Sequence, residues 1–217
     1  MKAYDPQIQR DRYRLHAADY DKGKRFSDRI RPCAIQRLDL QPGNTVLDLG
    51  CGTGLSFDQI WHNVGPEGRI IGVELSPDML DIARQKVERN GWDNVTLIQG
   101  DAREVEIPGP LDAVLAFFVP EVLISPPAVT RVIEAMAPGG RLVNGGVKHA
   151  QGLLGPLFNL YFQARFRTWR WVGVRGSMNR IFAKGQPYDQ LEKAVPQLER
   201  QDYMLGCAYI ARAVKDG

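Results

Sequence analysis

Short apolar runs alternate with segments of helical periodicity through residues 45–147, and this alternation limits the fold more than any other feature of the sequence. Five runs are short and apolar enough to be strands: 45–49, 69–75, 95–99, 111–118 and 141–147. Strands separated by helices form an open parallel sheet with helices on both faces. We expect the runs 95–99 and 111–118 to be buried on both faces, as parallel sheets require.

The helices carry their own boundary signals. SPD at 76–78 supplies an N-cap, a proline at the first helical position and an early acid, and NG at 90–91 should end that helix. SP at 125–126 opens another helix, with Met136 on its apolar face, and PGG at 138–140 should close it. Residues 198–205 and 207–215 are predicted to form an antiparallel hairpin at the edge of the sheet, with its turn near Gly206.

Composition excludes several classes of function. A net charge of +3, from 28 basic and 25 acidic side chains, is too small to indicate nucleic-acid binding. Cys33, Cys51 and Cys207 form no CxxC pair and no metal-ligand spacing, so we expect neither a disulfide framework nor a metal site. No apolar run approaches the ~18 residues of a membrane span, and the start of the chain lacks a signal peptide, so we expect a cytoplasmic protein.

The glycine-rich stretch VLDLGCGTGLSF at 46–57 follows the first predicted strand. Its spacing, Gly50, Gly52 and Gly54, is GxGxG and not the GxGxxG of a dinucleotide pyrophosphate site. Asp48 stands two residues before the loop, where a carboxylate would repel a phosphate but favour a ligand with an ammonium group, directly or through water. The loop is therefore predicted to hold a cationic ligand.

Two more acids end the next strands. Glu74 stands about 20 residues after the loop, where an acid accepts hydrogen bonds from both hydroxyls of a ribose. Asp101 and Ala102 follow the third strand and could bond an adenine, while Leu75 and Met79 could pack on its faces. An ammonium, a ribose and an adenine together indicate an amino acid joined to a nucleoside.

The run VLDLGCGTG, Glu74, GDA at 100–102 and RVIEAMAPGGRL at 131–142 resemble the class I S-adenosylmethionine-dependent methyltransferases. The resemblance is strongest to the small-molecule branch that includes the ubiquinone and menaquinone biosynthesis enzymes, and it covers residues 44 to about 147. It implies an α/β, Rossmann-like, doubly wound seven-stranded sheet, mostly parallel with an antiparallel C-terminal hairpin and with helices on both faces. It also implies S-adenosyl-L-methionine as cofactor and methyl transfer by in-line displacement.

The resemblance assigns Asp48 and the glycine loop to the methionine portion of the cofactor, Glu74 to the ribose, and Asp101 with Ala102 to the adenine. Phe117 matches a position whose backbone faces the methionine moiety. In related enzymes an N-terminal helix with an aromatic residue closes over the cofactor, so Tyr20 is a candidate for the methionine carboxylate; the alternative is a tyrosine that packs its helix on the sheet. The full set of predicted cofactor-binding residues is Tyr20, Asp48, Gly50, Cys51, Gly52, Gly54, Glu74, Leu75, Met79, Asp101, Ala102 and Phe117.

The acceptor is less defined. AFFVP at 116–120 lacks the NPPY or DPPY tetrapeptide that exocyclic-amine DNA methyltransferases share, and nothing resembles the loops of protein arginine or catechol methyltransferases. We therefore expect a small or lipid-like acceptor and no nucleic acid. Displacement from a sulfonium requires mainly alignment and desolvation, so no single catalytic residue is required. His149, just past the fifth strand, is a candidate general base, and Tyr20 is the other catalytic candidate. The alternative for His149 is that it caps a loop, and His62 is a weaker candidate. The N-terminal stretch brings His16, Tyr20 and Asp21 together.

The segment 152–185 is unusual because it contains no acidic residue, while six basic side chains interleave with aromatic ones. A helix from about Leu153 would place Phe158, Phe162, Phe166 and Trp169 on one stripe. Three uses compete: a lid packed on the domain, peripheral membrane contact through 153–184, and RNA binding.

We predict one domain over 1–217: an N-terminal helical cap at 1–43, a cofactor-binding core at 44–147, an aromatic and basic lid segment at 148–188 and the hairpin at 189–217. A competing hypothesis is a cofactor-binding, membrane-surface or partner-binding module that has this fold without turnover.

Overall fold

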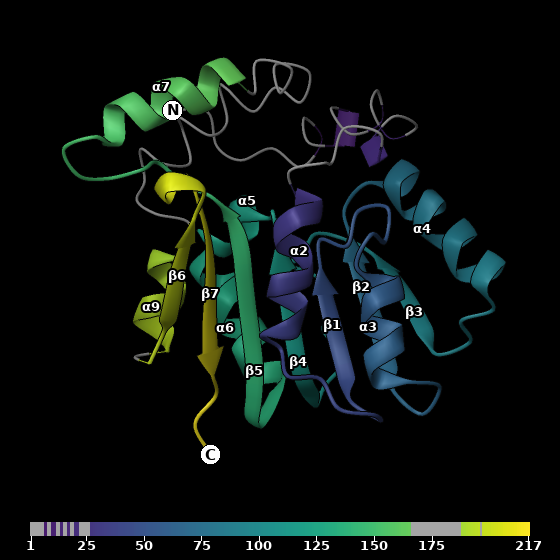
Figure 1. Ribbon diagram of the computed structural model, residues 1–217. Helices are drawn as coiled ribbons and strands as arrows, with labels where there is room; N and C mark the ends of the chain where they lie inside the picture. Colours follow the sequence, from purple (N-terminus) through teal and green to yellow (C-terminus); the bar gives the residue numbers. More distant parts are fainter. Residues whose placement is uncertain are drawn as a thin grey trace.

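The computed structural model describes residues 7, 10–11, 14, 17, 20–21, 27–165, 188–195 and 197–217. In this part of the chain seven strands form one sheet in the order β3-β2-β1-β4-β5-β7-β6 (Figure 1). The strands are β1 (Thr45–Leu49), β2 (Arg69–Glu74), β3 (Val95–Gln99), β4 (Leu111–Phe117), β5 (Met136–Val147), β6 (Glu199–Tyr203) and β7 (Ala208–Val214). Strands β1 to β5 are parallel, and β7 is antiparallel to both β5 and β6. The predicted fold class is confirmed.

Helices cover both faces of the sheet (Figure 1). One face carries α2 (Ser27–Gln36), α3 (Phe57–Val64) and α4 (Pro77–Asn90). The opposite face carries α5 (Pro120–Leu123), α6 (Pro126–Ala135) and α9 (Asp189–Ala194). A further helix, α7 (Gly155–Arg165), lies beyond the carboxyl end of β5, next to the short 3₁₀ turn η3 (Met204–Gly206) that joins β6 to β7.

Strand β1 contributes side chains to the hydrophobic cores on both faces of the sheet. Because successive side chains of a strand point to opposite faces, Val46 enters the core under α2 and α3, whereas Leu47 and Leu49 enter the core under α6. The prediction of burial on both faces is confirmed for β4 and wrong for β3, which is only half-buried. The reason is position, because β3 ends the sheet and pairs with β2 alone.

The start of α4 sets the position of the acid before it. Ser76 caps the helix, with its Oγ accepting from Met79 N at 3.4 Å, and Pro77 is the first helical residue. Gly91 ends the helix in the left-handed region, at φ 63°. Both boundaries agree with the sequence signals, and they leave Glu74 at the last position of β2, facing the cap.

The prediction for residues 136–140 is wrong. Helix α6 ends at Ala135, and Met136 is the first residue of β5, paired with Leu111. The PGG stretch continues this strand because Gly139 N donates to Lys215 O at 2.9 Å and Lys215 N donates to Gly140 O at 2.9 Å. Backbone pairing with the chain after β7 thus outweighs the local tendency of proline and glycine to form a turn.

The C-terminal hairpin is present, with β6 at the edge of the sheet and β7 inserted between β5 and β6. Helix α7 begins at Gly155, close to the predicted start at Leu153. Of the predicted aromatic stripe, Phe158 is half-buried, while Phe166, Trp169 and the side chain of Phe162 lie outside the described residues. Within the described ranges, no helix is long and apolar enough to span a bilayer.

Candidate functional site

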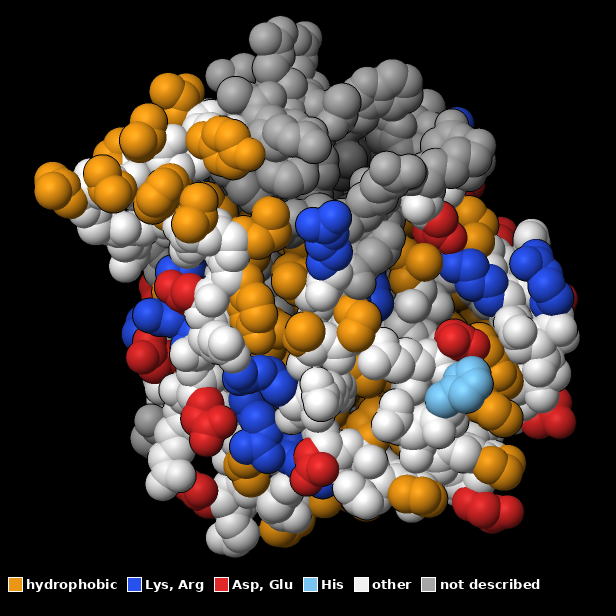
Figure 2. Space-filling view, viewed as in Figure 1, with side chains coloured by type: hydrophobic (Ala, Val, Ile, Leu, Met, Phe, Trp, Pro, Cys, Tyr) orange, Lys and Arg blue, Asp and Glu red, His pale blue; other side chains and the backbone are white. Residues whose placement is uncertain are grey.

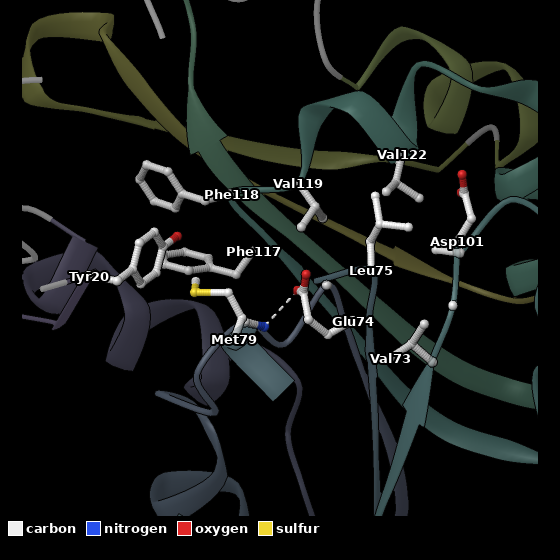
Figure 3. Close-up of a pocket in the computed structure, with 14 residues that line it drawn as sticks. Tyr20, Val73, Glu74, Leu75, Met79, Asp101, Phe117, Phe118, Val119 and Val122 are labelled. Carbon is white, nitrogen blue, oxygen red and sulfur yellow. Dashed lines mark hydrogen bonds between the residues drawn. The ribbon is translucent and has the colours of Figure 1, made fainter. Parts of the chain in front are cut away.

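A pocket opens at the carboxyl ends of the central strands, beside β1, from which the chain order runs outward in both directions. Ligands of open α/β sheets bind at such a position. The pocket is lined by Tyr20, Gly50, Gly52, Val73, Glu74, Leu75, Met79, Gly100, Asp101, Ala102, Phe117, Phe118, Val119 and Val122 (Figure 3). The structure thus brings most of the predicted set around one cavity, whereas Asp48, Cys51 and Gly54 do not line it.

The glycine loop is shaped by what lies against it. A Cβ on Gly50 would stand 2.3 Å from Cγ1 of Val119, so the glycine lets the loop after β4 approach the loop after β1. Gly52 adopts φ 57°, and its Cβ position faces Met79 Cε at 3.6 Å and Tyr20 Cε1 at 4.0 Å. Gly52 therefore presents bare backbone to the pocket, where a ligand can approach closely.

Glu74 joins the glycine loop to the start of α4. Its Oε2 accepts from Gly52 N at 3.0 Å, and its Oε1 accepts from Ser76 N at 2.8 Å. Burial raises the pKa of this carboxyl group, and the backbone hydrogen bonds oppose the shift. Since each carboxylate oxygen has a second lone pair, the fixed carboxylate can also accept from two hydroxyls of a ligand.

Asp48 lies beneath the loop and is 2% exposed. Burial raises its pKa to about 6, while the charge of Arg31 and a hydrogen bond from Ser56 act in the opposite direction. Its Oδ2 has no hydrogen-bond partner among the described residues. A buried oxygen of this kind favours a charged donor, so the geometry fits the ammonium group predicted from the sequence.

Arg31 is a site residue that the sequence did not reveal. It comes from α2, its Nη1 donates to Ser56 Oγ at 2.7 Å, and its guanidinium carbon lies 4.7 Å from the centroid of the Phe117 ring. It thus connects Asp48 with the aromatic wall of the pocket. No sequence motif identifies Arg31, because α2 is distant from the glycine loop in sequence and contacts it only in the folded protein.

Asp101 enters the pocket already paired. Its Oδ1 accepts from Arg103 N at 3.0 Å and from Arg103 Nε at 2.8 Å, and its Oδ2 forms an ion pair with Arg103 Nη2. Burial alone would raise its pKa, but the hydrogen bonds and charge of Arg103 outweigh burial and hold the pKa below its usual value. The carboxylate is thereby kept ionised, as an acceptor for an exocyclic amine must be.

Aromatic side chains form the opposite end of the pocket. Figure 3 shows Tyr20, Phe117 and Phe118 on one side of Glu74 and Asp101 on the other. The rings of Phe117 and Phe118 meet edge to face at 4.9 Å, and Phe118 adopts φ 64°, which is rare for a bulky residue. Sequence reasoning missed Phe118, Val119 and Val122, although AFFVP at 116–120 was a signal, since it spans the end of β4, which lies at the site.

The N-terminal segment is tied to the site by Asp21. Its Oδ1 accepts from Thr53 Oγ1 in the glycine loop at 2.6 Å, and its Oδ2 accepts from Lys86 Nζ in α4 at 2.8 Å. These two contacts hold the neighbouring Tyr20 at the mouth of the pocket. His16 lies outside the described residues.

The other two histidines stand away from the pocket lining. His149 lies two residues after the end of β5 and is half-buried, and it does not line the pocket. His62 is exposed on α3, with its Nδ1 2.7 Å from Asp58 O. Neither position brings a general base to the cavity.

Comparisons with known proteins find similarity to methyltransferases. A methyltransferase-domain family model matches residues 46–140. Demethylmenaquinone methyltransferase from Lactococcus lactis is 29% identical over 189 residues, which cover 82% of this chain and 71% of that protein.

Solved structures extend the likeness to nearly the whole chain. The N-methyltransferase NodS from Bradyrhizobium japonicum, in complex with S-adenosyl-L-homocysteine, has a TM-score of 0.65 at 17% identity and covers 96% of this chain and 99% of its own. A SAM-dependent methyltransferase from Aquifex aeolicus has a TM-score of 0.61 at 17% identity, covering 98% of this chain and 100% of its own. At these identities the likeness shows the fold.

Proposed function

We propose that this chain, a class I S-adenosylmethionine-dependent methyltransferase, transfers the methyl group in line to a small, lipophilic acceptor. The observation that carries the proposal is the division of one pocket into a polar end and an aromatic end. Glu74 and Asp101 belong to the polar end, and Tyr20, Phe117 and Phe118 to the aromatic end. A ligand that spans both would place its nucleoside part at the polar end and its reacting part at the aromatic end.

The polar end supplies directional partners for the cofactor. Glu74, fixed by two backbone amides, would accept the ribose hydroxyls, and Asp101, kept ionised by Arg103, would accept from the adenine amine. Leu75 and Val122 would pack on the ring. Asp48, through its unpaired oxygen, would accept from the ammonium group directly or through water.

The aromatic end supplies the environment for transfer. S-adenosylmethionine carries an electrophilic methyl group on a sulfonium, so the protein has to align the acceptor and exclude water. Aromatic faces attract such a cation without solvating it, which suits Tyr20, Phe117 and Phe118. Among the described lining residues this end offers no histidine or carboxylate, so proximity and desolvation are proposed as the main sources of acceleration.

The acceptor is testable by where the label goes. The protein is incubated with methyl-labelled S-adenosylmethionine and either a lipid extract in organic solvent or an aqueous metabolite extract. Demethylmenaquinone is tested as a defined candidate, because the names of relatives include it. We expect label in the solvent-soluble fraction. Label confined to water-soluble products, or binding of S-adenosylhomocysteine without any transfer, would contradict the lipophilic acceptor.

Two neighbouring glycines give a matched test of the aromatic end. A Cβ on Gly145 would stand 2.7 Å from the Phe117 ring, whereas one on Gly146 would stand 3.6 Å from Tyr209, an ordinary contact. We expect Gly145→Ala to displace Phe117 and lower kcat about tenfold, while Gly146→Ala leaves kcat unchanged. Equal activity of the two variants would remove Phe117 from the proposed site.

The proposal extends to peripheral contact with a membrane, from which a lipophilic acceptor would be collected. The sequence offered the segment 153–184 for this contact. The residues that support it are those of α7 and η3.

A further inference from the structure

Helix α7 exposes an unusual row of large apolar side chains. Leu153 is 97% exposed, and Leu154, Leu157, Leu160 and Tyr161 are also more than half exposed. Their spacing repeats at three and four residues, which places them on one side of the helix and of the turn before it. Figure 2 shows hydrophobic side chains gathered over α7, at the upper left of the molecule.

The opposite side of α7 is fixed to the sheet. Asn159 donates to Ala150 O at 3.0 Å and accepts from Ala150 N at 2.8 Å, and the Cys207 thiol lies 3.9 Å from Phe158 O. A Cβ on Gly155 would stand 2.5 Å from Ala150 O, so the helix start is pressed against the chain after β5. The direction of the exposed side is therefore set by these contacts.

A second, separate segment adds to the same surface. The turn η3 contacts α7 and exposes Met204 at 40% and Leu205 at 63%. Both residues have positive φ, 52° and 56°, which costs non-glycine residues on the order of 1 kcal/mol each. We name the exposed apolar residues of α7, its preceding turn and η3 the apolar face.

The charge of the surrounding sequence indicates what covers the apolar face. From Ala135 to Tyr188 the sequence contains no aspartate or glutamate, and residues 152–185 contain six arginines and lysines. Exposed leucines that are followed along the chain by a cationic stretch are complementary to a bilayer surface with anionic headgroups, where apolar side chains enter the acyl boundary. A protein partner would require no such absence of acids.

We propose that the apolar face docks the protein on an anionic lipid bilayer, with Leu153, Leu157, Leu160 and Leu205 entering the membrane. The face stands beyond the carboxyl ends of β5 and β6 (Figure 1). The pocket lies at the carboxyl ends of the central strands, and therefore at the same edge of the sheet. This inference names the lipid-facing residues of the membrane contact proposed above. It does not depend on the acceptor, because docking is measured without turnover.

The test is vesicle flotation of the full chain. Wild-type protein should float with vesicles of phosphatidylcholine mixed with phosphatidylglycerol, and less with pure phosphatidylcholine. The triple variant Leu153→Ser, Leu157→Ser, Leu160→Ser should lose at least about tenfold in partitioning, since each buried leucine contributes more than a tenfold factor when fully inserted. The matched control, methionine at the same three positions, keeps the apolar character and should float as the wild type does.

Two further measurements keep the result interpretable. Calorimetry with S-adenosylhomocysteine should give the same Kd for the serine and methionine variants, which shows intact folding; if the triple variant fails to fold, the singly changed Leu153→Ser and Leu205→Ser replace it. Equal flotation of wild type and serine variants overturns the proposal. So does a dimer in lipid-free solution that the serine changes dissociate, since the apolar face would then join two copies of this chain. In both cases methyl transfer to a detergent-solubilised acceptor is unaffected.

Discussion

The two halves of the sheet's carboxyl edge differ in what they bury and what they expose. Beside β1 and β2, charged groups are buried and held by backbone amides, as Glu74 is by Gly52 and Ser76. Beside β5 and β6, apolar groups are exposed, as Leu153 and Leu205 are. A polar ligand requires directional partners that short loops hold in place, whereas an apolar partner requires mainly accessible area. Binding at the first half therefore depends on a few residues in fixed positions, whereas binding at the second half depends on how many apolar side chains are exposed there.

The largest effect should come from Glu74→Gln. Both carboxylate oxygens accept from backbone N–H groups, so the amide of glutamine must turn its own NH₂ group toward a donor. We expect the affinity for S-adenosylhomocysteine to fall about a hundredfold, measured by calorimetry, because a charged hydrogen bond contributes ~1.5–3 kcal/mol. Glu88→Gln, on the exposed side of α4, is the matched control and should bind as the wild type does. A hundredfold loss of affinity in Glu88→Gln as well would show that the effect does not come from the hydrogen bonds of Glu74.

Asp48→Asn should separate stability from binding. Its folded pKa of about 6, raised by burial, means that ionising this carboxyl group costs more free energy in the folded protein than in the unfolded chain, although the group is mostly ionised at neutral pH. Removing the charge should therefore stabilise the ligand-free protein by about 1–3 kcal/mol in chemical denaturation, while cofactor affinity falls about tenfold. If stability and affinity both fall, Asp48 is a structural residue and not a partner of the ammonium group.

The same carboxyl group predicts a pH dependence with a defined sign. Because its folded pKa is raised, the stability that it contributes is fully present below about pH 4 and is lost as the pH rises through about 6. Cofactor affinity should change in the opposite direction and decrease below about pH 6, since the ammonium group binds the ionised form. Affinity titrated against pH should show this decrease in the wild type and lack it in Asp48→Asn.

The smallest effect should come from the core under the second half. Tyr209 donates to Asn144 Oδ1 at 2.5 Å, and Asn144 donates to Ala116 O at 2.9 Å, linking β7, β5 and β4. Tyr209→Phe should reduce the free energy of unfolding by about 1–2 kcal/mol, because a buried oxygen loses its donor. Cofactor affinity should not change. If Tyr209→Phe also lowered cofactor affinity, the two halves of the sheet's carboxyl edge would be energetically coupled, although their contacts are separate.

The site was readable from the sequence where a motif fixes the local geometry. Glu74 ends a strand, and the glycine loop and Asp101 each follow one closely. Because parallel strands bring their carboxyl ends to one edge of the sheet, chain order alone predicted that these residues lie together. Arg31 and Phe118 could not be found in this way. Arg31 contacts the lining residue Phe117 only through tertiary packing, and Phe118 lines the pocket in a rare backbone conformation. Met136 was misassigned since local turn propensity was overruled by pairing with Leu111. Of the aromatic stripe predicted for α7, the described side chains include only Phe158, which is half-buried, and the exposed side carries leucines and Tyr161.

Lys148 and Tyr188, which stand on either side of residues 149–187, both contact the C-terminal hairpin. This arrangement affects how far the sequence between them can vary among related chains. Lys148 is held by Asp202 at 2.7 Å and by Cys207 O at 3.0 Å, and Tyr188 packs its ring against Tyr209 at 4.9 Å. The chain before and after this stretch is thus attached to the C-terminal hairpin through residues that lie outside the stretch. A related chain could therefore carry a different sequence between these two positions and keep both attachments.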